Sequence, residues 1–270
     1  MMLVNGVPGN TINAEDRGLA YGDGVFRTLR MQAGSPVCWE RQFAKLQHDC
    51  NALKILCPSA LVLSSELQQL GKIQPDGIGK IIITRGVSTR GYAPSTQSEA
   101  TRIVSVTPIT AYPADYAKQG VRVHVCKVRL GHQFLLAGIK HLNRMENVLA
   151  AMEWQDQDVP EGLLGDISGF VISGTRSNLF MFRGNILYTP SLTRCGVAGM
   201  QRDRVMDWAK QHGVACKVAD FRMEELVQAD EIFLVNSVFG LWPVRELAGY
   251  RRTTHPVAWK IQEWLNDERH

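Results

Sequence analysis

Two pairs of short apolar stretches in the second half of the chain limit the folds open to it. One pair occupies 162–172 and turns at 168–169, and the other occupies 177–188 and turns at 183–185. Strands joined by such short turns pair antiparallel, because a parallel pair needs a crossover of roughly a dozen residues or more. Since a helical pattern precedes both hairpins, the sequence predicts an α+β fold and not a parallel α/β sheet.

The first half carries strand and helix patterns of its own. Asn5-Gly6 after a short apolar run is a strong signal for a tight hairpin turn. The patterns that follow predict strand 25–31, helix 41–56, helix 64–70, strand 79–84 and strand 102–107. A stretch with proline and polar residues then separates the two halves. We therefore expect a smaller N-terminal α+β domain at 1–108, a linker at 109–120 and a larger C-terminal α+β domain at 121–270.

The composition excludes several classes of protein. Hydrophobic residues make up 45% and charged residues 21% of the chain, and the formal net charge is only +4. No block of Lys and Arg suggests nucleic-acid binding, and no apolar run approaches the roughly 18–20 residues of a membrane span. The six cysteines show no paired Cys/His spacing, so neither a metal site nor a disulfide framework is expected. With no signal-peptide pattern at its start, the chain is expected to be cytoplasmic.

Lys140 directly follows the apolar run 135–139, so burial of its side chain is expected. An ammonium in apolar surroundings loses hydration, and a neutral, nucleophilic amine that can form an imine becomes accessible. The local pattern by itself favours the ordinary alternative, in which the lysine head reaches water along the apolar surface. A helix is expected at 143–154, with Val148, Leu149 and Met152 facing inward.

Several segments resemble a known enzyme family, in the same order along the chain. They are 16–26 (DRGLAYGDGVF), 84–92 (TRGVSTRGY), 137–150 (AGIKHLNRMENVLA), 177–180 (SNLF) and 199–202 (GMQR). The family is that of the fold type IV pyridoxal-phosphate enzymes, the branched-chain and D-amino-acid aminotransferase fold. The resemblance implies two α+β domains with pyridoxal 5'-phosphate in the cleft between them, and a homodimer. It also implies that Lys140 is the Schiff-base residue and the general base.

The resemblance assigns further residues to the cofactor and the substrate. Lys45 stands where relatives usually carry an arginine for the cofactor phosphate, and it supplies charge without a bidentate fork. The helix that opens at Gly199 would offer main-chain N–H groups to the same phosphate. The other expected cofactor-binding residues are Ser173, Met200, Gln201 and Ser237. The expected substrate-binding residues are Arg85, Arg90, Tyr92, Phe26, Thr28 and Asn236.

The sequence departs from the family pattern at Ser173. Relatives usually carry a glutamate there, paired with the protonated pyridine nitrogen. A serine can hydrogen-bond a neutral pyridine nitrogen but cannot offset the charge of a pyridinium. The electron sink is therefore expected to be weaker, which affects transamination more than an elimination driven by aromatisation.

Within the family the segments are most similar to the lyases that act on 4-amino-4-deoxychorismate. This implies a small-molecule substrate with two carboxylates, held by Arg85 and Arg90 and converted to 4-aminobenzoate and pyruvate for folate biosynthesis. An aminotransferase of D-amino or branched-chain acids is the nearest alternative. A cofactor-binding protein with little catalysis is another, since Lys45 and Ser173 replace more usual residues. The last alternative is a non-catalytic interaction protein, in which Lys140 is an ordinary lysine and no cofactor binds.

Overall fold

The computed structural model describes residues 1–270 apart from 89–90, 96–97, 110 and 268–270. The chain forms two compact units, each with its own sheet. Unit 1 consists mainly of Met1–Thr110 and Ile139–Asn143, and unit 2 of Ala111–Gly138 and Arg144–Arg269. Lys140, assigned to the C-terminal domain from the sequence, thus belongs by its contacts to unit 1, because its segment is hydrogen-bonded to a strand of that unit.

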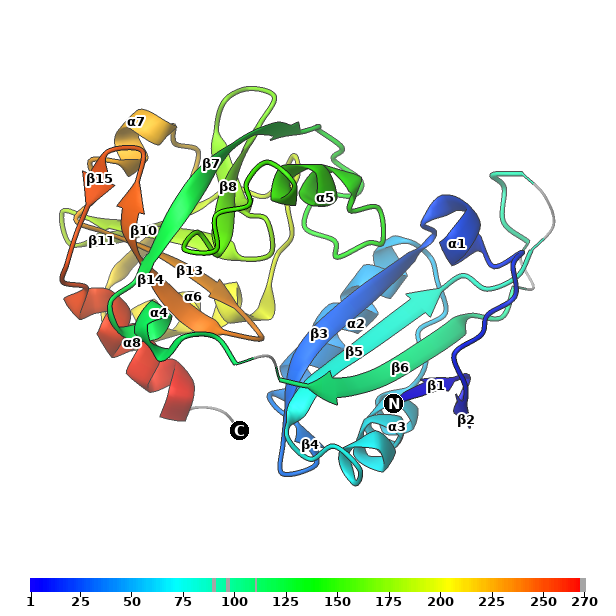
Figure 1. The fold of residues 1–270 in the computed structure, drawn as a ribbon. Helices are drawn as coiled ribbons and strands as arrows, with labels where there is room; N and C mark the ends of the chain where they lie inside the picture. The colour runs from blue at the N-terminus through cyan, green and yellow to red at the C-terminus, as the bar shows by residue number, and fades with distance from the viewer. Residues whose placement is uncertain (89–90, 96–97, 110, 268–270) are drawn as a thin grey trace. The chain divides into compact units, whose positions relative to one another are not determined.

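Unit 1 is built on a six-stranded antiparallel sheet with the strand order β2-β1-β6-β5-β3-β4. Helices α2 and α3 both lie on one face of this sheet (Figure 1). The pairing of β1 with β2 confirms the hairpin predicted at Asn5-Gly6. The elements of the unit are β1 (Met2–Val4), β2 (Val7–Pro8), α1 (Arg17–Tyr21), β3 (Gly24–Gln32), β4 (Ser35–Pro36), α2 (Trp39–Ala52), α3 (Ala60–Gly71), β5 (Gly77–Thr84) and β6 (Thr101–Pro108).

Strand β3 presents different side chains to its two faces. Val25, Arg27 and Leu29 are buried, whereas Phe26 and Thr28 are only half-buried. This alternation follows from the two-residue period of a strand, in which successive side chains point to opposite faces. The buried face packs in the apolar core of the unit, where each fully buried aliphatic side chain contributes about 1.5–3 kcal/mol. The pleat therefore fixes Phe26 and Thr28 on the face that the core leaves open.

Unit 2 contains a nine-stranded mixed sheet. Eight of its strands follow the order β12-β11-β10-β13-β14-β7-β8-β9, and the ninth, β15, pairs with β14. β9 also pairs with β10 through Ser173 and Asn178, so the strands from β10 to β9 close into a ring. The elements are α4 (Ala114–Lys118), β7 (Val121–Leu130), α5 (Met145–Ala151), β8 (Glu161–Asp166), β9 (Val171–Gly174), β10 (Asn178–Arg183), β11 (Ile186–Pro190), α6 (Met200–Gln211), β12 (Ala215–Ala219), α7 (Met223–Leu226), β13 (Glu231–Asn236), β14 (Gly240–Leu247), β15 (Tyr250–Arg251) and α8 (Pro256–Asp267).

The hairpins predicted in this half are both present, because β8 pairs antiparallel with β9 and β10 with β11. Three further pairings are parallel: β11 with β12, β14 with β7, and β7 with β8. The segments that contain α5 and α6 make the crossovers from β7 to β8 and from β11 to β12. The helix predicted from Gly199 is α6, and its Val205, Trp208 and Ala209 are buried as expected. The α+β class is confirmed, with a mixed sheet in unit 2.

The orientation predicted for helix α5 is wrong. Val148 and Leu149 are each 50% exposed and Met152 is 70% exposed, while Ala150 is the buried residue of the helix. The apolar spacing of this helix therefore marks a face that the chain itself leaves uncovered. We call the exposed apolar side chains of this face and of the segment before Lys140 the apolar patch: Phe134, Leu135, Met145, Val148, Leu149 and Met152.

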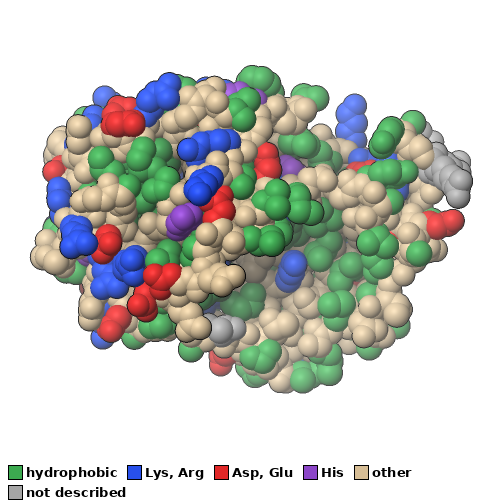
Figure 2. Space-filling view, turned by 45° about the horizontal axis from the view of Figure 1, so that its top comes forward, with side chains coloured by type: hydrophobic (Ala, Val, Ile, Leu, Met, Phe, Trp, Pro, Cys, Tyr) green, Lys and Arg blue, Asp and Glu red, His purple; other side chains and the backbone are tan. Residues whose placement is uncertain are grey.

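The surface carries charges of both signs. Figure 2 shows acidic and basic side chains interspersed on the face that it draws, with hydrophobic side chains between them. A continuous basic stripe of the kind that follows a nucleic-acid backbone is not seen on that face. Within the described part of the chain, no helix combines the length and the apolar character that crossing a membrane requires.

Candidate active site

Main-chain hydrogen bonds fix Lys140 to β3 and α2. Its carbonyl accepts from Phe26 N at 3.0 Å, and its N–H donates to Asp49 Oδ2 at 3.1 Å. Leu142 N donates to Gly24 O at 2.9 Å, so segment 139–143 runs along β3 as a short additional strand. The half-buried side chain places Nζ 4.4 Å from the centroid of the Phe26 ring, in cation–π contact. The backbone thus directs the lysine head onto the open face of β3.

A buried ion pair lies behind this lysine. Asp49 on α2 is 1% exposed and Arg27 on β3 is 3% exposed, and Arg27 Nη2 donates to Asp49 Oδ2. The same carboxylate oxygen accepts the N–H of Lys140. Arg27 Nη2 also donates to the carbonyl of Lys45 at 3.1 Å. Helix α2, strand β3 and the lysine segment are therefore held together by one buried carboxylate.

The structure brings some of the predicted residues of unit 1 together. Phe26 contacts Lys140, and Thr28 shares the open face of β3 with Phe26. Lys80, which pairs with Thr28 across the sheet, has its Nζ 5.6 Å from the same aromatic ring. Lys45 is half-buried on α2, one turn before the aspartate that binds Lys140 N. Two ammonium groups beside one ring suit an anionic ligand.

Arg85, predicted to bind a substrate carboxylate, is largely engaged inside unit 1. Its Nε and Nη2 donate to the two oxygens of Asp23 at 2.8 and 3.0 Å. Nη1 donates to Lys54 O at 2.9 Å, and Nη2 also to Leu53 O at 2.8 Å. A guanidinium has five N–H donors, and these four bonds leave one of them for a ligand. In this structure Arg85 joins the end of β5 to the turn after α2.

The same carboxylate receives a second arginine. Arg17 is 4% exposed, and its Nε donates to Asp23 Oδ2 at 2.9 Å. Burial alone raises the pKa of Asp23, but the hydrogen bonds and charges of Arg85 and Arg17 outweigh it and hold the pKa below its ordinary value. Arg17 also donates to the carbonyls of Gly91 and Tyr92, both at 2.8 Å. The exposed Tyr92 is thereby tied to α1, and the predicted Arg90 lies outside the described residues.

In unit 2 the start of α6 has the properties of an anion site. Asp203 N donates to Gly199 O as the first helical bond, so the preceding N–H groups of the helix have no partner within it. No described side chain caps this end of the helix. The N–H of Gly199 itself donates to Asn178 Oδ1 at 3.1 Å, so Met200 and Gln201 are the better candidates for donors. A Cβ at Gly199 would lie 2.3 Å from that oxygen, which explains the glycine.

Ser173 lies close in the fold to this helix start. It pairs with Asn178 across β9 and β10, and Asn178 binds the loop before α6 through Val197 O at 2.8 Å and through Gly199 N. Ser173 is 7% exposed, and its Oγ donates to Gly174 O at 2.9 Å. To donate to a neutral ring nitrogen, as the sequence analysis expected, the hydroxyl would have to turn its hydrogen away from Gly174 O.

The remaining predicted residues lie at the end of β13 and in the turn that joins it to β14. Asn236 Oδ1 accepts the N–H groups of Val238 and Phe239, both at 2.8 Å, and its Nδ2 donates to Arg176 O at 3.2 Å. The amide of Asn236 therefore shapes this turn, and it has little capacity left for a substrate. Ser237 is half-buried in the same turn.

Comparison with known proteins gives the family. A model of the class IV amino-transferases matches residues 24–247. The chain belongs to this family of enzymes, and the fold type IV architecture expected from the sequence is confirmed.

Two of the most similar proteins are lyases. The chain is 35% identical over 245 residues to the aminodeoxychorismate lyase of Vibrio harveyi, with 90% of each chain covered. It is 43% identical to the 4-amino-4-deoxychorismate lyase from Pseudomonas aeruginosa, whose crystal structure superposes with a TM-score of 0.95 over 99% of this chain and 98% of that one. The branched-chain amino acid aminotransferase of Escherichia coli shares the fold at 22% identity, with a TM-score of 0.86 over 97% and 92% of the two chains.

The described residues fit the cofactor that this family uses. Pyridoxal phosphate needs an amine for covalent attachment, donors for its phosphate and a partner for its ring nitrogen. Lys140 supplies an amine on a fixed backbone, the start of α6 supplies uncapped N–H groups, and Ser173 supplies a buried hydroxyl. Each requirement thus has a candidate residue in a suitable local environment.

Proposed function

We propose that this chain converts 4-amino-4-deoxychorismate to 4-aminobenzoate and pyruvate, with pyridoxal 5'-phosphate as its cofactor. The observation that carries the proposal is the 43% identity to a lyase of this specificity over 99% of the chain. The fixed main chain of Lys140 supports it, because a covalent attachment point needs a defined position. The six free cysteines support a place in the reducing cytoplasm.

When bound, the cofactor supplies an electron sink for charge that develops on the substrate. Lys140 Nζ would hold the cofactor and later take the proton from the ring carbon that bears the substrate amine. Lys45 and the N–H groups of Met200 and Gln201 would bind the phosphate. Ser237 would add a hydroxyl to it, and Ser173 would contact the ring nitrogen.

For the substrate carboxylates we propose a division between the two predicted arginines. Arg85 spends most of its donors on Asp23 and on the turn after α2, so it acts mainly by positioning the chain that follows β5. Arg90 follows Arg85 in the sequence and would contribute the charge that binds a carboxylate. Phe26 and Thr28 would line the substrate's path on the open face of β3.

The deciding experiment measures both products. Purified enzyme with bound cofactor should release 4-aminobenzoate and pyruvate in equal amounts from 4-amino-4-deoxychorismate, with no added 2-oxo acid. Transfer of the amine of D-alanine or L-leucine to 2-oxoglutarate, with no 4-aminobenzoate formed from 4-amino-4-deoxychorismate, would identify an aminotransferase instead. A protein that binds the cofactor and turns over none of these compounds would identify the non-catalytic alternative.

Ser173→Glu should raise amine transfer from D-alanine to 2-oxoglutarate by roughly tenfold or more, because a carboxylate stabilises a protonated ring nitrogen that serine does not. The rate is measured by the pyruvate formed from D-alanine. Ser173→Ala serves as the control, since it removes the hydroxyl without adding charge, and it should leave transfer low. An unchanged transfer rate in a folded Ser173→Glu enzyme would show that this position does not set the choice between the two reactions.

We also propose a homodimer in which a second copy covers the apolar patch. Leu135 is 82% exposed and Leu149 is 50% exposed in the single chain, and a group of exposed large apolar side chains is typical of an interface. Leu135→Asp combined with Leu149→Asp should give a monomer in sedimentation equilibrium where the wild type is a dimer. Leu61→Asp, on the exposed face of α3 at 75% exposure, should leave the dimer intact. A dimer that persists in the double variant would refute this interface.

A further inference from the structure

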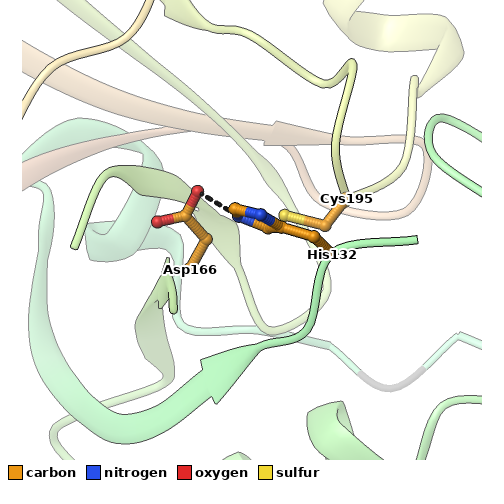
Figure 3. Close-up of side chains that lie close together, drawn as sticks. All are labelled: His132, Asp166 and Cys195. Carbon is orange, nitrogen blue, oxygen red and sulfur yellow. Dashed lines mark hydrogen bonds and ion pairs between the residues drawn. The ribbon is translucent and has the colours of Figure 1, made fainter. Parts of the chain in front are cut away.

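Three potential metal ligands lie together in unit 2, although they are distant in sequence. His132 follows β7, Asp166 ends β8, and Cys195 lies in the loop between β11 and α6. One donor atom from each lies within 4.8 Å of the others. His132 Nε2 is 2.9 Å from Asp166 Oδ2. Figure 3 shows the imidazole facing the carboxylate, with the sulfur of Cys195 beside the ring.

The spacing of these atoms is close to that of ligands on one tetrahedral ion. Bonds of about 2.0–2.3 Å to zinc place two ligand atoms roughly 3.3–3.7 Å apart. The histidine and aspartate atoms are slightly closer than this, and the cluster as a whole is slightly wider. A small opening of the His132–Asp166 pair and a small inward rotation of Cys195 would bring all three to coordination distance.

The surroundings hold the donors and leave a route of entry. Asp166 Oδ1 accepts the N–H groups of Ser168 and Phe170 at 3.0 and 2.9 Å, which leaves Oδ2 directed at His132. Asp166 is fully buried and Cys195 is 7% exposed, whereas the side chain of His132 is 18% exposed. An ion would therefore enter from the histidine side and keep one position open to water.

The local charges suit a divalent cation. Asp166 and a deprotonated Cys195 together supply two negative charges. Arg194 approaches, with its Nε 3.6 Å from Asp166 Oδ2, but that buried Nε makes no hydrogen bond. The Arg194 guanidinium is also paired with Asp220, at 2.6 Å from Nη2 to Oδ1, so the two carboxylates share its positive charge. A cation bound to Asp166 would replace Arg194 as its ionic partner, and Arg194 would keep its shorter contact with Asp220.

We propose that His132, Asp166 and Cys195 bind a zinc ion, or a divalent cation of similar softness. As the bond to Sγ forms, the thiol proton passes to solvent. The imidazole takes the tautomer protonated on Nδ1, and Nε2 and Oδ2 exchange their mutual hydrogen bond for bonds to the metal. Water fills the fourth position. The sequence analysis predicted no metal site. Three ligands from three separate segments leave no spacing pattern that could have revealed one.

Metal binding would connect the segment that leads to Lys140 with the loop that leads to α6. These two segments are already joined at both ends, by Gln133 N to Arg194 O at 2.9 Å and by Gly138 N to Gly196 O at 3.0 Å. An ion on His132 and Cys195 adds a third connection between them. Bound zinc should therefore raise the melting temperature, because it binds the folded chain and not the separated ligands.

The test titrates the cofactor-loaded enzyme, stripped of metal, with zinc in equilibrium dialysis. We expect about one zinc per chain, and affinity at least tenfold lower in Cys195→Ser and in His132→Gln. Cys216→Ser is the matched control, since this half-buried cysteine on β12 belongs to no such cluster among the described residues. Cobalt(II) should give a near-ultraviolet thiolate band that is lost in Cys195→Ser and kept in Cys216→Ser.

Either of two results would overturn the proposal. One is an absence of stoichiometric zinc binding by the wild type, and the other is binding that both cluster variants retain. Should Cys195→Ser fail to fold, the partly exposed His132→Gln variant decides, through zinc affinity and through loss of the zinc-dependent rise in melting temperature. None of these readouts depends on turnover, so the metal site and the lyase reaction succeed or fail separately.

Discussion

Lys140→Ala is expected to abolish covalent cofactor binding and to lower turnover by roughly a thousandfold or more, because both the attachment point and the proton acceptor are lost. The fold should survive. The hydrogen bonds that anchor this residue to Phe26 and Asp49 are made by its main chain, which alanine retains. We therefore expect the free energy of unfolding to change by less than about 1 kcal/mol.

The visible absorbance of the bound cofactor and the rate of 4-aminobenzoate formation measure these effects. Lys80→Ala is the matched control, because the Nζ of Lys80 lies 5.6 Å from the same Phe26 ring that Lys140 contacts at 4.4 Å. This control should keep the cofactor attached. Attachment that survives in Lys140→Ala, or that is lost only in Lys80→Ala, would contradict the assignment.

Asp49→Ala is expected to lower the free energy of unfolding by about 3–5 kcal/mol, because it removes the carboxylate that balances the buried charge of the Arg27 guanidinium. It also removes the acceptor for Lys140 N, so turnover should fall in the protein that remains folded. Urea unfolding followed by circular dichroism measures the first effect. Replacing both members of the pair, as in Asp49→Leu with Arg27→Met, should cost less than Asp49→Ala alone.

An exposed ion pair provides the comparison. Glu246 lies 3.7 Å from Arg251, and their side chains are 37% and 78% exposed. Glu246→Ala should change the free energy of unfolding by no more than about 1 kcal/mol, because solvent already screens that pair. If Asp49→Ala proved as mild as Glu246→Ala, the buried carboxylate would not be the link between α2, β3 and the lysine segment.

Local sequence patterns predicted the elements of the fold well, since strand and helix periods are properties of neighbouring residues. The segment around Lys140 could be recognised for the same reason. The role of Asp49 could not be recognised, because a carboxylate on an amphipathic helix usually lies on the solvated face. Its contact with Lys140 also spans 91 residues of sequence. Asn178 was missed as a positioning residue for Gly199 because its role depends on a pairing across the sheet. The orientation of α5 was predicted wrongly because an apolar stripe does not show whether the same chain or another molecule covers it.

The return of segment 139–143 to unit 1 affects how the protein is made. During synthesis, the strand that ends at Gln32 and the helix that ends at Ala52 leave the ribosome long before Lys140 does. Until then Phe26 N lacks its acceptor, and the carboxylate of Asp49 lacks one of its donors. A fragment that ends near residue 108 would permanently lack this last strand. The nascent N-terminal portion therefore completes its structure only after about half of the chain has been translated, and cutting the linker would not yield two self-sufficient halves.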